Sequence, residues 1–201
     1  MNLIEKATII HYHRHRLSQY RAGTVESLGW RGRESQLRRF EVVGDLGNFR
    51  GHSVLDAGCG YGDLKAWLDG RFDGFRYLGV DQMPEFIGEA KIRWAGVPDT
   101  HFVQSDFARA PLPDSDFVIA SGALGYRCAD PGFYFETIAR LFAAARMAFA
   151  FNMLDAARFA PHELLVGHDR AAVTGFCRRL CPNVRMIDGY LLDDFTVFMI
   201  R

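Results

Sequence analysis

The stretch VLDAGCGYGDL, residues 54–64, places three glycines at alternate positions between an apolar run and a segment with a helical pattern. Glycine in such a turn lets the chain bend tightly and lets a ligand contact the backbone. The first turn of the following helix also offers N–H groups that have no partner inside the helix. The stretch therefore predicts a strand, a ligand-binding turn and a helix, in that order.

Short strand-like runs alternate with helical patterns from residue 53 onward, as is typical of a parallel sheet with crossover helices. The expected strands are 53–56, 77–81, 101–104, 117–120 and 147–152, and the expected helices are 62–69, 85–94, 133–145 and 170–179. Two later runs, 184–187 and 195–200, are close enough to pair as an antiparallel hairpin. We expect an α/β fold: a doubly wound, Rossmann-like, seven-stranded and mostly parallel sheet that ends with an antiparallel last strand at its edge.

The first 50 residues lie outside this alternation. They are typical of two or three helices, for example at 4–20 and 34–46, separated by Gly23 and by the segment 29–32. We expect them to form an N-terminal helical cap (1–50) over the open end of an α/β core (51–201). A chain of 201 residues that is 49% hydrophobic fits one such domain, spanning 1–201.

The charge and hydropathy patterns exclude several classes of protein. The 24 basic and 24 acidic residues cancel, whereas a nucleic-acid-binding domain normally has a basic excess. The apolar runs are far shorter than the roughly 20 residues that cross a bilayer, and residues 1–16 lack the apolar core of a signal peptide. We expect a cytoplasmic protein with no membrane or nucleic-acid partner, whose four cysteines are reduced thiols.

The spacing of the glycines narrows the class of ligand. Residues 56–62 read D-x-G-x-G-x-G, and Asp63 occupies the position where a dinucleotide fingerprint needs glycine. The carboxylate of Asp56 disfavours a pyrophosphate and suits an ammonium group. Asp81, at the end of the second strand, can accept hydrogen bonds from both hydroxyls of a ribose. Asp106 and Phe107 follow the third strand and can offer an acceptor and a ring face to adenine.

With these residues the sequence resembles the class I S-adenosylmethionine-dependent methyltransferases. The resemblance rests on four signals in order, namely the glycine loop, Asp81, the Asp106 motif and a fourth strand that ends in Ala120-Ser121-Gly122, and it covers about residues 36–201. It implies an enzyme that uses S-adenosylmethionine and releases S-adenosylhomocysteine. The cofactor contacts that it implies are Asp56, Gly58, Cys59, Gly60 and Arg39 for the methionine part, Ser121 and Gly122 near the sulfonium, Asp81 for the ribose, and Gln82, Met83, Asp106 and Phe107 for the adenine.

The acceptor side is expected to come from the N-terminal helices and from the segments 121–126 and 152–155. Tyr126, His13 and Tyr12 are the candidate catalytic residues. Amines and carboxylates can attack an activated methyl group directly, whereas a phenol or alcohol needs a base to take its proton. His11 and His15 share a helix face, but no third ligand completes a metal site, so no metal is expected.

The size of the acceptor is suggested by what the sequence lacks. No long insertion separates the fifth strand from the final hairpin, and residues 153–168 form only a modest loop that can act as part of a lid. We therefore expect a small-molecule acceptor. Three alternatives stay open: a macromolecule methyltransferase that needs a partner, a non-catalytic sensor of the cofactor or its product, and a nicotinamide-dependent oxidoreductase that shares only the architecture.

Overall fold

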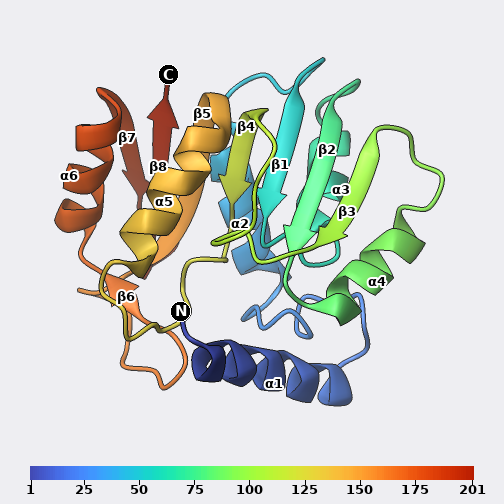
Figure 1. Cartoon of the computed structure of the whole chain (residues 1–201), viewed down its shortest axis with the longest axis horizontal. Coiled ribbons are helices and arrows are strands. Elements are labelled where there is room, and N and C mark those ends of the chain that lie inside the picture. Colours follow the sequence, from blue (N-terminus) through green and yellow to red (C-terminus); the bar gives the residue numbers. More distant parts are fainter.

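Strands and helices alternate along the chain in the computed structural model, which describes residues 1–201 (Figure 1). The helices are α1 (Leu3–Gln19), α2 (Arg33–Gly44), α3 (Asp63–Asp69), α4 (Pro84–Arg93), α5 (Phe133–Ala144) and α6 (Arg170–Leu180). The strands are β1 (Ser53–Ala57), β2 (Arg76–Asp81), β3 (Thr100–Gln104), β4 (Ser115–Ala120), β5 (Ala145–Asp155), β6 (Gly167–His168), β7 (Asn183–Asp188) and β8 (Asp194–Ile200). None of the six helices combines the length and the apolar character that a bilayer crossing requires.

The sheet has the strand order β3-β2-β1-β4-β5-β8-β7, with the two-residue β6 paired to β5. The first five strands of this order are parallel, and β8 runs antiparallel to both of its neighbours. The chain order reverses at the neighbouring strands β1 and β4, so the connections that follow these two strands lead to opposite faces of the sheet and leave a crevice at their carboxyl ends. The predicted doubly wound, mostly parallel sheet is confirmed.

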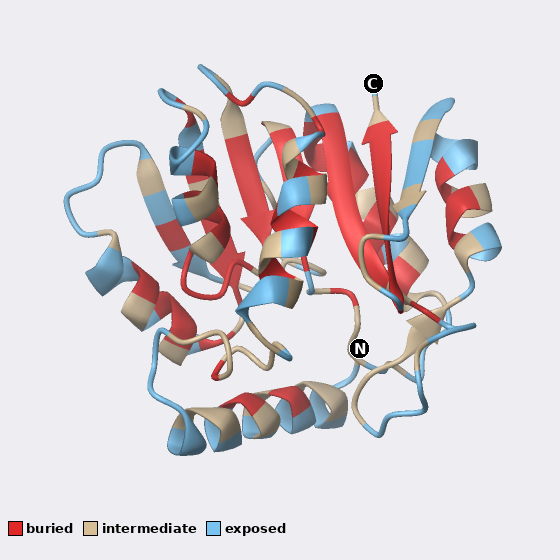
Figure 2. Cartoon of the chain, turned by 180° about the vertical axis from the view of Figure 1, so that it is seen from behind, coloured by how far each residue is buried: buried red, intermediate tan, exposed pale blue.

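Two apolar clusters, one on each face, hold helices against the sheet. Buried residues of α5 and α6, such as Ile138, Leu141 and Val173, pack with β4, β5 and β8 on one face. Buried residues of α2, α3 and α4 pack with β1, β2 and β4 on the other face. Figure 2 shows the central strands buried along most of their length, as strands covered on both faces must be.

The position of β8 corrects one expectation. The last strand was expected at the edge of the sheet, but β8 lies between β5 and β7, and β7 forms the edge. Residues 194–199 are all buried, whereas every residue of β7 is exposed or half-buried. A continuous apolar run suits an interior strand that is covered on both faces, while a polar, exposed strand suits an edge. The two-residue β6 was not predicted, because two residues form no readable pattern.

The two N-terminal helices have different places in the fold. Helix α1 lies across the carboxyl ends of the parallel strands, as expected of a cap (Figure 1). It begins with a capping box in which Asn2 and Glu5 bond each other's backbone N–H groups. Helix α2 instead packs on a face of the sheet, where Phe40 and Val43 join the same apolar cluster as α3. The cap over the carboxyl ends of the strands therefore consists of α1 and the segment that joins it to α2.

Candidate active site

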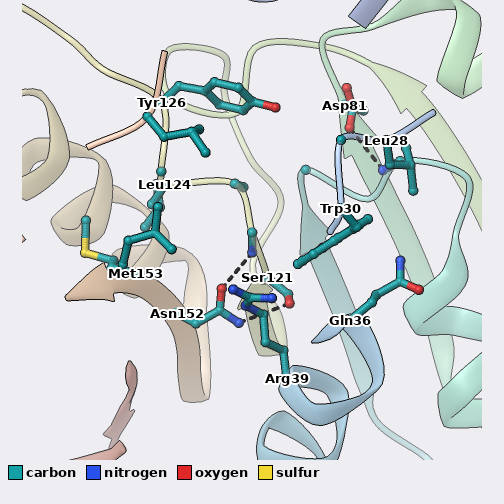
Figure 3. Close-up of a pocket in the computed structure, with 18 of the residues that line it drawn as sticks. Leu28, Trp30, Gln36, Arg39, Asp81, Ser121, Leu124, Tyr126, Asn152 and Met153 are labelled. Atoms are coloured by element: carbon teal, nitrogen blue, oxygen red, sulfur yellow. Dashed lines mark hydrogen bonds between the residues drawn. The ribbon is translucent and has the colours of Figure 1, made fainter. Parts of the chain in front are cut away.

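A cavity of about 390 Å³ lies between the carboxyl ends of the strands and α1 (Figure 3). All the residues expected to bind the cofactor line it, and they come from five separate stretches of the chain: Arg39, Asp56, Gly58, Cys59, Gly60, Asp81, Gln82, Met83, Asp106, Phe107, Ser121 and Gly122. His13 and Tyr126 line it as well. Tyr12 does not, because its ring lies against Gly29 instead.

The three glycines of the loop after β1 all have left-handed backbone conformations, with φ of 85° at Gly58, 54° at Gly60 and 78° at Gly62. A Cβ on Gly58 would lie 2.5 Å from Cβ of Ala123, and a Cβ on Gly60 would lie 2.8 Å from Leu28. Gly58 and Gly60 thus present bare backbone to the cavity. Gly62 does not line the cavity. A Cβ there would clash with the rings of Trp94 and Phe102, so glycine at this position allows these rings to pack closely against the start of α3.

Asp81 connects the glycine loop to the turn after β2. Its Oδ2 accepts the backbone N–H of Gly60 at 3.0 Å, and its Oδ1 accepts the backbone N–H of Met83 at 2.9 Å. Burial raises the pKa of this carboxyl, and the two backbone bonds oppose that rise. Each oxygen keeps a further lone pair, so the side chain can still accept hydrogen bonds from two hydroxyl groups of a ligand.

Asp56 is buried at the end of β1 and accepts a hydrogen bond from the hydroxyl of Tyr77. Burial raises the pKa of its carboxyl from 3.8 to about 7, the Tyr77 bond lowers it, and the nearby carboxylates of Asp81 and Asp63 raise it. No lysine or arginine pairs with Asp56. An ammonium group in the cavity would stabilise its ionised form, because opposite charges attract strongly where water is excluded.

The raised pKa of Asp56 predicts a pH-dependent stability. Between pH 3.8 and about 7 the folded state holds one proton more than the unfolded state, so the free energy of unfolding falls as pH rises. Asp56→Asn removes the titrating carboxyl group. The free energy of unfolding of the variant, relative to that of the native protein, should therefore rise by about 2–3 kcal/mol when the pH is raised from 5 to 8. Urea unfolding at both pH values measures the difference. Asp73→Asn, at an exposed position, should show no such pH-dependent change. An equal change in both variants would contradict the raised pKa of Asp56.

Of the residues expected to contact adenine, Asp106 contacts the cap. Asp106 forms an ion pair with Lys6 of α1, and its Oδ1 accepts the backbone N–H of Ala108 at 3.0 Å. Phe107 is half-buried beside it. Met83 is fully buried and packs with Tyr61 and Phe86. Helix α1 thus reaches the cofactor side of the cavity through Lys6.

Asn152 of β5 organises the loop after β4 (Figure 3). Its Oδ1 accepts the backbone N–H of Gly122 at 2.8 Å, and its Nδ2 donates to Oγ of Ser121 at 3.1 Å. Gly122 has φ of 73°, and a Cβ there would lie 2.5 Å from Trp30. The sequence had placed Asn152 in an acceptor-side segment without a role. A polar residue within an apolar strand run was the signal that could have identified it.

Arg39 lines the cavity, but its guanidinium is already engaged. Its Nε donates to Oδ2 of Asp194 at 2.9 Å, a second nitrogen of the fork pairs with the same oxygen, and a third donates to the Ser35 carbonyl at 3.1 Å. The guanidinium also lies 4.9 Å from the centre of the Trp30 ring. A ligand carboxylate at this point would share Arg39 with Asp194. No local pattern pairs Arg39 with Asp194, although two adjacent acids, Asp193 and Asp194, stand where the last strand begins.

His13 of α1 and Tyr126 of the loop after β4 meet across the cavity. Oη of Tyr126 lies 2.6 Å from Nε2 of His13, and the Nδ1 of His13 is buried without a partner. Burial and the charge of Arg16 lower the pKa of His13 to about 4, so the ring is neutral at pH 7. Burial also raises the pKa of the Tyr126 hydroxyl. No group of three or more histidine, cysteine or acidic side chains has a geometry that could hold a metal.

The fold and the glycine loop define a class: this cavity is that of a Rossmann-like methyltransferase. A family model described as a methyltransferase domain matches residues 54–145. A Mycobacterium tuberculosis protein, provisionally named methyltransferase Rv1506c, is 33% identical over 163 residues, which are 73% of this chain and 92% of that protein. The chain therefore belongs to the class I S-adenosylmethionine-dependent methyltransferases, and its cofactor is S-adenosylmethionine.

Other relatives are similar over shorter stretches or in fold alone. Trans-aconitate 2-methyltransferase of Escherichia coli K12 is 35% identical over 72 residues, which are 35% of this chain and 27% of that enzyme. The crystal structure of magnesium protoporphyrin IX methyltransferase from Synechocystis, with bound S-adenosylhomocysteine, has a TM-score of 0.74 at 19% identity and covers 98% of this chain and 99% of that one. The DhpI–S-adenosylhomocysteine complex has a TM-score of 0.68 at 21% identity, with 94% and 93% covered.

Proposed function

We propose that this protein transfers the methyl group of S-adenosylmethionine to a small molecule bound beneath α1. The observation that supports this is that α1, which lies across the carboxyl ends of the strands (Figure 1), lines the cavity with Lys6, Ile9 and His13 and so forms its roof. Lys6 pairs with Asp106, Glu5 accepts the backbone N–H of Ala129 at 2.6 Å, and Arg14 pairs with Glu85 at 2.6 Å. A roofed cavity suits a ligand that it can enclose, whereas a macromolecule needs an open approach to the reacting atom.

The residues around the cavity fit the cofactor. Gly58 and Gly60 leave space that a Cβ would occupy, Asp81 has free lone pairs for two hydroxyls, and buried Asp56 lacks a cationic partner. When bound, S-adenosylmethionine supplies an activated methyl group on a sulfonium. The chain itself has to orient the acceptor in line with that group and exclude water, and α1 and the loop after β4 are suited to both tasks because both line the cavity. The names of two of these relatives mention trans-aconitate and magnesium protoporphyrin IX, which agrees with a small acceptor.

Thermal unfolding with S-adenosylmethionine, S-adenosylhomocysteine or NAD tests the cofactor part of the proposal. A ligand at about 100 times its dissociation constant adds about 2.7 kcal/mol, which raises the midpoint by roughly 5–11 °C in a domain of this size. We expect this rise with both sulfur ligands and none with NAD. A rise with NAD alone would contradict the proposal.

Methyl transfer to a small-molecule fraction of a cell extract tests the acceptor part. S-adenosylhomocysteine should form with this fraction and not with the RNA or protein fractions. Transfer to RNA or protein alone would support the macromolecule alternative. Binding of the cofactor with no transfer to any fraction would support the sensor alternative.

A further inference from the structure

The basic side chains that line the cavity are all paired with acids. There are three of them, and the pairs are Lys6 with Asp106, Arg31 with Asp193, and Arg39 with Asp194. Arg31 is two-thirds exposed and stands at the rim. Six aspartates line the cavity in all, so acids outnumber bases even before the neutral His13 is considered. An anionic acceptor would find no free basic side chain here and would meet a surplus of carboxylates.

The wall next to Tyr126 is apolar. Leu124 and Met153 are almost fully buried and line the same cavity as Tyr126 (Figure 3). Leu165 forms a β-bridge with Tyr126, and both Leu154 and Leu165 lie close to Gly125. Phe159 adds an aromatic ring to the cavity lining. This wall suits the apolar body of a ligand, since burial of such a surface is favourable without any polar partner.

The Tyr126–His13 pair is the polar feature on this apolar side. Its hydrogen bond joins α1 to the loop after β4 across the cavity, 2.6 Å between Oη and Nε2. When Nε2 accepts the hydroxyl proton of Tyr126, the lone pairs of Oη are free to accept a proton from a ligand. His13 is neutral at pH 7, so its Nε2 lone pair is available, although the burial that lowers its pKa also makes the imidazolium costly to form. The pair can therefore take one proton from an acceptor group beside Tyr126.

We propose that the acceptor is an uncharged, largely apolar molecule that presents a hydroxyl group to Tyr126, and that the Tyr126–His13 pair removes its proton. This inference rests on the methyl transfer proposed above. The acceptor oxygen bonds the methyl carbon through a lone pair, while the carbon–sulfur bond breaks and its electron pair stays on sulfur. The hydroxyl proton passes to Oη of Tyr126, and the Tyr126 proton passes to Nε2 of His13. One positive charge leaves sulfur and one forms on the imidazole ring, so charge is conserved.

The first test compares acceptors that share one apolar body. The probes are 2-naphthol, 2-naphthylamine and 2-naphthoate, with the phenyl analogues of each and the tricarboxylate trans-aconitate. Formation of S-adenosylhomocysteine is measured by mass spectrometry, and binding is measured by calorimetry with S-adenosylhomocysteine present. We expect the hydroxyl compounds to bind and to exceed their amine and carboxylate counterparts at least tenfold in kcat/KM.

The second test uses variants of the pair. Tyr126→Phe removes the hydroxyl, and His13→Gln keeps a hydrogen-bond partner for Tyr126 but cannot take a proton. We expect each to lower kcat about 10²-fold. The double variant should lose little more, because the two residues act as one unit. The dissociation constant of S-adenosylhomocysteine should stay within about twofold in all three. The matched controls Tyr20→Phe and His11→Gln, both on exposed positions, should keep native rates.

The outcomes separate this inference from the proposed function. Transfer to trans-aconitate or the naphthoate, with inert hydroxyl compounds, would overturn the inference and leave small-molecule methyl transfer standing. The same holds if the amines are preferred, or if no hydroxyl compound binds. Native kcat in Tyr126→Phe would overturn the role of the pair. Transfer only to RNA or protein would overturn the inference and the proposed function together.

Discussion

Asp81→Ala is expected to weaken binding of S-adenosylhomocysteine about 100-fold or more and to destabilise the fold. The contacts proposed for this carboxylate are hydrogen bonds from two ligand hydroxyls, and two charge-assisted hydrogen bonds of about 1.5–3 kcal/mol each account for such a loss. The same substitution leaves the backbone N–H groups of Gly60 and Met83 without their acceptors. At about 1–3 kcal/mol for each buried donor, the free energy of unfolding should fall by about 2–6 kcal/mol.

Calorimetric titration and urea unfolding of the same preparations measure both effects. Asp81→Asn keeps one carbonyl oxygen, so it should retain part of the stability while it still loses most of the ligand affinity. Asp73→Ala, at an exposed position, should change either quantity by less than about 0.5 kcal/mol. Native affinity in Asp81→Ala would show that this carboxylate does not contact the cofactor.

Arg39→Met is expected to lower the free energy of unfolding by about 3–5 kcal/mol and the thermal midpoint by roughly 6–20 °C. The substitution leaves the buried carboxylate of Asp194 without its basic partner. Burial already raises the pKa of Asp194, and the charge of Arg39 opposes that rise. Without Arg39 the folded-state pKa should rise further. A raised folded pKa means that stability is lost as pH rises, so the deficit should be larger at pH 8 than at pH 5.

Two further variants make this prediction specific. Arg38→Met changes the neighbouring, exposed arginine, which pairs with Glu41, and should alter stability by less than about 0.5 kcal/mol. Arg39→Met combined with Asp194→Asn removes the orphaned charge and should recover much of the loss. Equal losses in the Arg38 and Arg39 variants, or no recovery in the combined variant, would contradict the role given to this ion pair. Thermal and urea unfolding at both pH values supply the comparison.

The architecture was predictable because its signals are local. The alternation of strands and helices is a matter of periodicity, and the glycine loop and Asp81 follow strands whose carboxyl ends must meet at one edge of a parallel sheet. These rules bring the predicted cofactor residues to one cavity without any knowledge of side-chain contacts. The place of β8 was less accessible, because pairing between β5 and β8 joins segments about 50 residues apart and no local pattern encodes it.

The contacts made by charged side chains were not predictable for the same reason. Lys6 and Asp106 are 100 residues apart, and Arg39 and Asp194 are 155 apart. A sequence shows that each is charged, but the choice of partner depends on how the elements pack. The same holds for the candidate catalytic residues Tyr12, His13 and Tyr126, which the sequence suggests only by residue type. The orientation of α1 in the fold decides that His13 faces the cavity while Tyr12 lies against Gly29.

The central place of β8 also determines when the sheet can form during synthesis. A ribosome makes β5 and β7 before it makes residues 194–200, which pair with both of them. Until those residues leave the exit tunnel, β5 has an open edge beside the apolar side chains Phe149, Phe151 and Met153, and β7 has no neighbour to pair with. Such an edge is prone to pair with other chains. We therefore expect the nascent protein to be most prone to aggregation before β8 inserts.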